Sequence, residues 1–200
     1  MNLSVLLVGD RPMSRDRDEI NKQFQAVDGA YRAGDLAALR IALGDPPGFP
    51  SCRQPHELGV SDYPLEYAIY WSPLAFIEEL IANRADPNYP DDAGFPSLIA
   101  ALSSGRRDQH DILRLLLDSC ADVDQRGFND WTALHYAVVQ RDLDGVRLLL
   151  ERGADPSLKT RIDDCTSPLE DAEAMGFEAA AALLRASLGT AHARGRKGET

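Results

Sequence analysis

A cysteine and a histidine four residues apart form the first pair in this sequence whose side chains could share a chemical task. Cys52 and His56 lie in a proline-rich segment, and both residue types are common zinc ligands. A zinc site needs three or four ligands at defined spacing, and no second pair lies near these two in the sequence. The pair alone therefore does not predict a metal site.

Paired aspartates are the second group of candidates. The pairs are Asp91 with Asp92, Asp122 with Asp124, and Asp163 with Asp164. A calcium loop alternates its ligands and closes with a bidentate glutamate, and the segment DVDQRGFND lacks that frame. The sequence also lacks a phosphate-binding glycine loop, a G-x-S-x-G turn and an H-E-x-x-H helix. We therefore expect a protein that is not an enzyme and that uses no metal and no cofactor.

Charge and composition narrow the class of partner. The 200 residues carry a net charge of -11, with 44% hydrophobic and 26% charged residues, as in ordinary globular proteins. Nucleic-acid binding needs clustered Lys and Arg, so we expect no nucleic-acid partner. A basic surface on another protein would be attracted instead.

The cysteines and the N-terminus indicate the compartment. Three cysteines without paired spacing favour a reducing environment. The apolar run VLLV at 5–8 follows no basic residue and is too short for a signal peptide or a membrane span. We expect a cytoplasmic protein with no membrane association, and abundant arginine beside scarce lysine suggests a bacterial one. VLLV either covers the first helices or forms a homodimer contact, and the sequence does not choose between them.

A repeat of about 33–36 residues organises the chain. The segments NRADPN, SCADVD and RGADPS each follow three apolar residues spaced i, i+3, i+4, which share one face of a helix. These triplets are Ile77, Leu80, Ile81; Leu113, Leu116, Leu117; and Val146, Leu149, Leu150. A shorter helix is expected before each, starting at YPLEYAI, PSLIAAL and TALHYAV, and SPLEDAE starts a further copy.

The repeated motifs resemble the ankyrin repeat family. The matching residues are Thr132, Leu134, His135 and Ala137 of its T-P-L-H-x-A motif, and Gly153, Ala154 and Asp155 of its G-A-D motif. The resemblance implies an all-α solenoid of about five stacked helix-loop-helix units with short hairpin loops. We place the units at about 20–50, 60–92, 93–128, 129–161 and 163–188. An N-terminal extension at 1–19 and a disordered tail at 189–200 flank them.

Two features of the motifs bear on individual residues. By resemblance, His135 joins hydrogen bonds between neighbouring loops rather than catalysing a reaction, and the other units have no histidine at that position. The glycine that ends the second helix, Gly153, is replaced by Arg84 and Cys120 in the two preceding units. We expect both residues to adopt the left-handed backbone conformation that suits glycine, at an energetic cost.

The resemblance also implies where a partner binds. Ankyrin-type proteins use a concave face made from loop tips and the exposed side of each first helix. Carried over, these positions are Tyr70, Trp71, Asp92, Phe95, Phe128, Asn129, Trp131, Gln140, Asp163 and Asp164, and neighbouring ones include Val139, Thr166, Ala174 and Met175. Aromatic residues among carboxylates are typical of protein-binding hot spots. The alternative is internal packing, with the segment 44–62 folded over Tyr70 and Trp71.

These observations favour a protein–protein interaction module, an adaptor or scaffold that holds a partner protein on an acidic and aromatic concave face. A bacterial inhibitor or immunity protein that blocks a toxic enzyme is an alternative, as is a non-catalytic regulatory subunit of an enzyme. The sequence does not identify the partner or the oligomeric state.

Overall fold

The structure is a computed structural model, and it describes residues 17–90, 95–162 and 165–195. Within these residues the chain forms ten α-helices and two short 3-10 helices, and no strand. The all-α expectation is therefore confirmed. VLLV at 5–8, together with Asp92, Asp163 and Asp164, lies outside the described residues.

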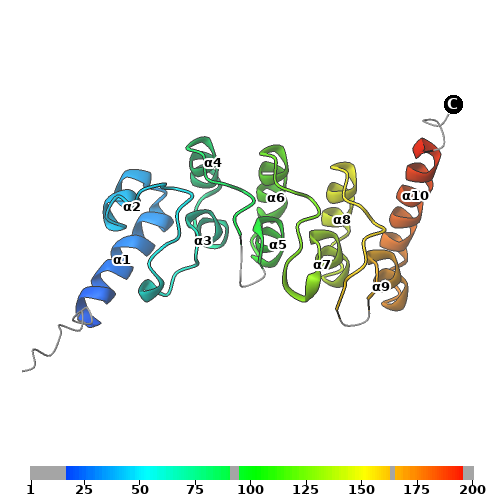
Figure 1. The fold of residues 1–200 in the computed structure, drawn as a ribbon, viewed down its shortest axis with the longest axis horizontal. Coiled ribbons are helices and arrows are strands. Elements are labelled where there is room, and N and C mark those ends of the chain that lie inside the picture. The colour runs from blue at the N-terminus through cyan, green and yellow to red at the C-terminus, as the bar shows by residue number, and fades with distance from the viewer. Residues whose placement is uncertain (1–16, 91–94, 163–164, 196–200) are drawn as a thin grey trace, which may run out of the picture.

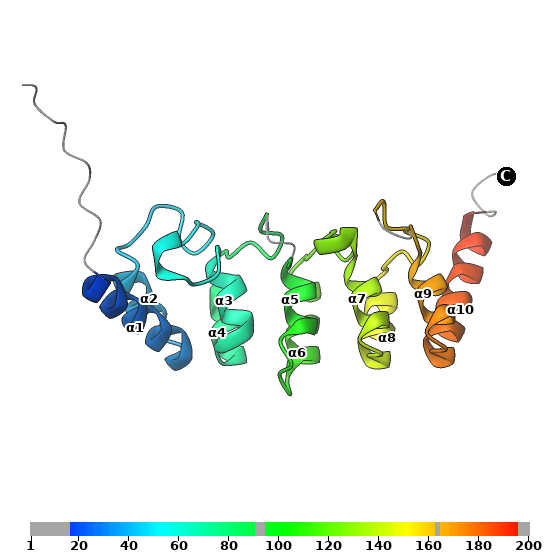
Figure 2. The same ribbon diagram turned by 90° about the horizontal axis from the view of Figure 1, so that it is seen from below.

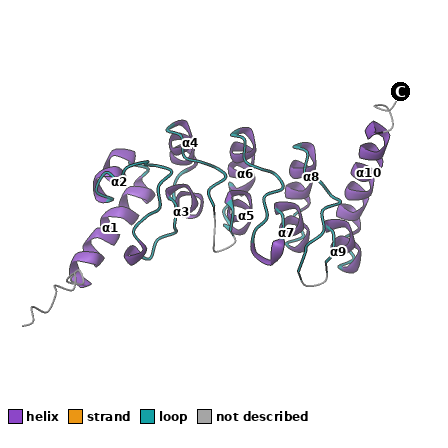
Figure 3. Ribbon diagram, viewed as in Figure 1, coloured by secondary structure: helices purple, strands orange, loops and turns teal. Residues whose placement is uncertain are grey.

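The α-helices form five consecutive pairs. Their bounds are α1 Arg17–Ala33 and α2 Leu36–Ala42; α3 Pro64–Trp71 and α4 Leu74–Ala82; α5 Ser97–Ser103 and α6 Gln109–Asp118; α7 Ala133–Val139 and α8 Leu143–Glu151; α9 Pro168–Ala174 and α10 Glu178–Gly195. Helices α3, α5, α7 and α9 form one row, and α4, α6 and α8 form a second row beside it (Figure 1). Teal loops join the pairs (Figure 3), and two of them contain the 3-10 helices η1 (His56–Leu58) and η2 (Phe128–Asp130).

The core runs along the whole stack and is built from the repeated apolar triplets. In each of the three triplets the first two residues are fully buried, and the third packs partly against the core. Each buried leucine or isoleucine stabilises the folded state by roughly 1.5–3 kcal/mol relative to exposure. Because consecutive pairs contact one another, this burial is shared across unit boundaries.

Side chains that cap helix N-termini explain where several helices begin. Asp35 accepts a hydrogen bond from the Ala38 amide, and Asp142 accepts one from the Gly145 amide. Ser167 and Glu170 form a reciprocal capping box at the start of α9. Proline at the first helical position of α3 and α9 costs no hydrogen bond there.

A polar side chain in three of the turns reaches the next turn of the stack. Ser51 Oγ donates to the Arg84 carbonyl at 2.7 Å, and Asn88 Nδ2 donates to the Cys120 carbonyl at 3.0 Å. The Asp155 amide donates to Asp124 Oδ1 at 3.0 Å. These bonds satisfy backbone groups at the ends of the second helices and set the spacing between units.

The first aspartate of each of three turns stabilises that turn. The carboxylates of Asp86, Asp122 and Asp155 each accept a hydrogen bond from the amide two residues further on, at 2.8–3.1 Å. This is the Asx-turn geometry of a tight backbone turn. The presence of these carboxylates is therefore accounted for by their hydrogen bonds in the turns.

The last helix is longer than the sequence suggested. Residues 189–200 were expected to form a disordered tail, but α10 continues to Gly195. Alanine is the strongest helix former, and the segment following 178 is rich in it. Composition alone therefore misplaced the helix end.

Arg84 and Cys120 adopt the left-handed conformation, with φ of 71° and 65°, beside 90° at Gly153. The expectation from the motif is thereby confirmed. Arg141, which follows α7, also has a positive φ of 56°, and this residue was not anticipated. Its guanidinium donates to the Met175 carbonyl at 3.0 Å, so its side chain has a structural task that glycine could not take over.

Replacing either strained residue by glycine should stabilise the protein. Arg84→Gly and Cys120→Gly each remove a left-handed side-chain clash but loosen the unfolded chain, for a net gain of about 0.5–1 kcal/mol. Thermal and urea unfolding should show both gains, and alanine at the same positions should show none. A clear fall in melting temperature for both glycine variants would contradict the strain argument.

Candidate protein-binding surface

The loops that precede the first helices project from the same end of the stack (Figure 2). We call the surface formed by these loops and by α3, α5, α7 and α9 the inner face. One backbone hydrogen bond closes each of three loops at its base. The amides of Gln54, Gly127 and Thr160 donate to the carbonyls of Asp62, Trp131 and Thr166, at 2.7, 2.7 and 3.0 Å. The loops are therefore held as hairpin-like turns without a regular strand pair.

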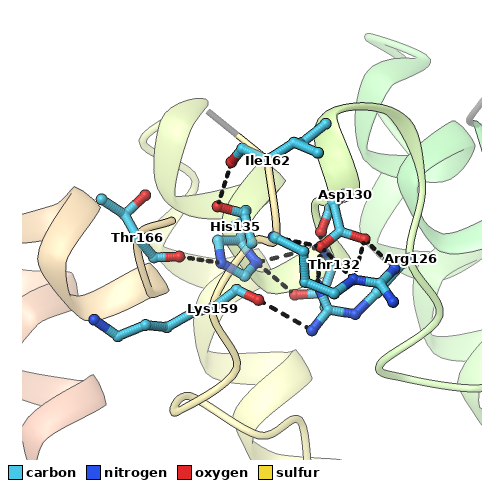
Figure 4. Close-up of polar contacts among 9 residues, drawn as sticks. Arg126, Asp130, Thr132, His135, Lys159, Ile162 and Thr166 are labelled. Atoms are coloured by element: carbon cyan, nitrogen blue, oxygen red, sulfur yellow. Dashed lines mark hydrogen bonds and ion pairs between the residues drawn. The ribbon is translucent and has the colours of Figure 1, made fainter. Parts of the chain in front are cut away.

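His135 ties two of these loops together. Its Nδ1 accepts the amide hydrogen of Thr132 at 3.2 Å, so Nε2 carries the proton and donates to the Thr166 carbonyl at 3.2 Å (Figure 4). The ring is fully buried, and burial lowers its pKa. A neutral histidine with both nitrogens engaged serves structure, as the resemblance implied.

Asp130 is the polar centre of the same region (Figure 4). It pairs with Arg126 at 2.6 Å and with Arg161, whose amide also donates to it at 2.7 Å. The hydrogen bonds from Arg161 are the largest cause that lowers the pKa of this carboxyl from 3.8 to about 2. Arg126 also donates to the Lys159 carbonyl at 3.1 Å. This network fixes the backbone that presents Trp131.

Four aromatic rings make a continuous row on the inner face, which we call the aromatic ladder: Phe95, Phe128, Trp131 and Tyr136. Phe95 stacks on Phe128 with ring centres 5.5 Å apart and planes 14° apart. Trp131 lies 5.0 Å from Phe128 and 6.3 Å from Tyr136. All four rings are partly buried. The ladder thus joins the third and fourth units and still reaches solvent.

A second aromatic site lies near the other end of the inner face, at Trp71. This ring is 50% exposed, and the Arg32 guanidinium lies over it at 4.9 Å from the ring centre. Arg32 is held there by Asp28, whose carboxylate accepts two hydrogen bonds from Nε at 2.8 and 2.9 Å. Arginine on tryptophan is a favourable cation–π arrangement.

The segment 44–62 does not bury this tryptophan. Its Gln54 side chain accepts a hydrogen bond from the Tyr31 hydroxyl at 2.7 Å, and Arg53 donates to the Tyr63 hydroxyl at 3.2 Å. Tyr70 is partly buried, and its hydroxyl lies 2.8 Å from Ser103 Oγ of the next unit. Tyr70 is therefore held by a contact within the stack, whereas Trp71 is half exposed and is contacted by Arg32.

The remaining candidates from the sequence fall into two groups. Asn129 and Gln140 are described and exposed, at the tip of η2 and directly after α7. Asn129 has a positive φ of 52°, which an asparagine tolerates better than most residues. Nothing is assigned to Asp92, Asp163 and Asp164, which lie outside the described residues.

An open pocket of about 350 Å³ lies between the fourth and fifth units. It is lined by Trp131, Val139, Thr160, Thr166, Asp171, Ala174 and Met175. Sequence comparison with the family motif pointed to several of these but missed Asp171 and the ladder residue Tyr136. Both occupy the fifth position of their motif copies, TALHY and SPLED, so comparing the copies column by column would have found them.

No group of three or more His, Cys, Asp or Glu side chains among the described residues is placed to hold a metal ion. No helix in the described part is long and apolar enough to cross a membrane.

Removing the charge of Asp130 should destabilise the loops. Asp130→Asn is expected to cost about 1–3 kcal/mol at neutral pH, because a largely covered carboxylate with two arginine partners is lost. A carboxyl whose pKa is lowered on folding stabilises above its unfolded pKa, and this contribution disappears as the pH falls from about 4 towards 2. Urea unfolding across this range should show the gap between wild type and variant closing, and a pH-independent gap would contradict the assignment.

Comparison with known proteins places this geometry in a family. Residues 62–160 match the family of ankyrin repeats in three copies. Similar proteins include alpha-latrocrustotoxin-Lt1a of Latrodectus tredecimguttatus, 31% identical over 62% of this chain and 10% of the toxin, and palmitoyltransferase Hip14 of Drosophila melanogaster, 34% identical over 52% and 16%. A putative ankyrin repeat-containing protein of Treponema pallidum (strain Nichols) is 39% identical over 42% and 28%. This chain spans well under a third of the length of each, and with its stacked helix pairs it belongs to the ankyrin repeat family.

Proposed function

We propose that this chain is a non-enzymatic adaptor that binds a partner protein on its inner face. Ankyrin repeats are generally protein–protein interaction modules, and repeat arrays offer extended surfaces for that purpose. The observation that carries the proposal is the aromatic ladder, four partly exposed rings in contact on the face that the loops frame. Tryptophan and tyrosine are enriched among residues that dominate binding energy.

The acidity of the chain supports a partner with a basic surface. The net charge of -11 attracts such a partner over a distance and speeds its approach. Several basic residues do lie on this face, but they are engaged: Lys159 pairs with Glu170 at 2.7 Å, and Arg126 and Arg161 pair with Asp130. These basic side chains are therefore already neutralised by carboxylates of the chain, and the excess charge that a partner meets is negative.

The chemistry of the histidine supports a role without catalysis. A general base needs a nitrogen that is free to take a proton from the substrate. In His135 both ring nitrogens are engaged and the ring is buried, so it has no such position. Cys52 and Cys120 form no disulfide, which fits the proposed cytoplasmic setting.

Removing the Trp131 ring from the aromatic ladder should lower the affinity for the partner more than it lowers the stability of the fold. Trp131→Ala in the full chain is expected to raise the dissociation constant by about thirtyfold or more, since hot-spot tryptophans contribute about 2 kcal/mol or more. The partner would be captured on immobilised protein from cells that make it, identified by mass spectrometry, purified and titrated.

Ile41→Ala provides the matched control for this measurement. Ile41 is an exposed residue of α2, 79% accessible and outside the inner face, so its loss should leave affinity unchanged. Unfolding of Trp131→Ala in urea gives the second comparison. Intact binding together with a large loss of stability would assign the ladder to packing and reject the proposed surface.

A further inference from the structure

We propose that the pocket between the fourth and fifth units binds an arginine side chain of the partner protein. This inference rests on the proposed function, because it names the chemistry that the inner face recognises. The pocket of about 350 Å³ lies beside the aromatic ladder, with Trp131 of the ladder and the end of α9 in its lining. It has room for one long side chain and its guanidinium group.

The pocket walls combine an aromatic ring, a thioether and a carboxylate. Trp131 brings the indole ring, the aromatic side chain that attracts cations most strongly. Met175 is 37% exposed and adds a polarisable wall for the aliphatic part of a guest side chain. Thr160 and Thr166 border the same space. These walls match a side chain with an apolar stem and a positively charged planar end.

Asp171 supplies the negative charge. It is partly buried and lies in the first turn of α9, and its carboxylate has no hydrogen-bond or ion-pair partner among residues 17–90, 95–162 and 165–195. The nearby cations have other partners, since Lys159 pairs with Glu170, and Arg161 with Asp130. Arg141 is bound to the Met175 carbonyl and lies 5.0 Å from the centre of the Phe177 ring. Asp171 is therefore the one carboxylate of the pocket lining, and no described cation pairs with it.

At the other end of the inner face, an arginine of the chain already lies between a tryptophan and an aspartate. There the chain provides its own arginine, Arg32, which lies over Trp71 and donates its hydrogen bonds to the Asp28 carboxylate. Tryptophan and aspartate thus hold one guanidinium in a single arrangement. Trp131 and Asp171 offer the same two groups in the pocket, and the described chain places no arginine between them. A guest arginine would complete the second arrangement.

Arginine fits better than lysine for two physical reasons. A guanidinium is planar, so it can stack on the indole while its edge donates two parallel hydrogen bonds to a carboxylate. An ammonium is a compact, strongly hydrated charge that gives up water less readily. The site therefore selects for shape as well as for charge.

The test uses short peptides as probes on the full chain. Acetylated and amidated Gly-Gly-Arg-Gly-Gly would be titrated while the indole N–H signal of Trp131 is followed by NMR, with Trp71→Phe used to assign the two indole signals. We expect a saturable shift in the millimolar range for the arginine peptide. Asp171→Asn should weaken binding by about tenfold, because a charge-assisted bidentate pair is lost. The matched control Asp144→Asn, an exposed aspartate of α8 paired with Arg147, should change nothing.

Two further peptides separate the outcomes. A citrulline peptide has nearly the same shape without the charge, and a lysine peptide has the charge without the plane. Binding of either one as strong as that of the arginine peptide would overturn the assignment, and so would an unmoved Trp131 signal or an unaffected Asp171→Asn. Partner capture by the full chain is measured separately, so the inner face can stand as a binding surface even when this pocket fails.

Discussion

A pair of short helices cannot cover its own apolar face, and that constraint shapes the whole molecule. Each second helix buries two residues of its triplet fully, and the next pair completes the cover. Burial needs this repetition, but it does not fix how far apart the pairs stand. The turn-to-turn bonds made by Ser51, Asn88 and Asp124 do so, because each joins a side chain of one turn to the backbone of the next.

Because the units stack at a fixed spacing, equivalent motif positions of successive units lie in a row on the surface. Tyr136 and Asp171 occupy the same position in two copies, and each contributes to the inner face. Packing positions must keep their apolar character, and these surface positions are free to vary in size and charge. One end of the face therefore presents a tryptophan covered by an arginine of the chain itself, and the other end a tryptophan beside a carboxylate that has no partner in the described part of the chain.

The periodic positions made most of the fold predictable. Spacing of the triplets located the second helices, and the substitutions at Arg84 and Cys120 pointed to left-handed residues because the backbone there is dictated by the motif. Contacts between distant segments were out of reach. The pairing of Asp130 with Arg161 joins two loops that come together only when the helix pairs stack. Neither loop sequence contains a pattern that predicts it. The end of α10 was misjudged because a tail and a terminal helix have similar composition.

Well-anchored loops suit the inner face to the binding role that we propose for it. Trp131 follows a residue fixed by two arginines, its carbonyl accepts the Gly127 amide at 2.7 Å, and the next residue caps α7 through His135. A side chain held in this way loses little conformational freedom when a partner covers it, so less of the interaction energy is spent on ordering. In the proposed complex, the polar network that stabilises the loops would thereby also contribute to affinity, although none of its charges has to touch the partner.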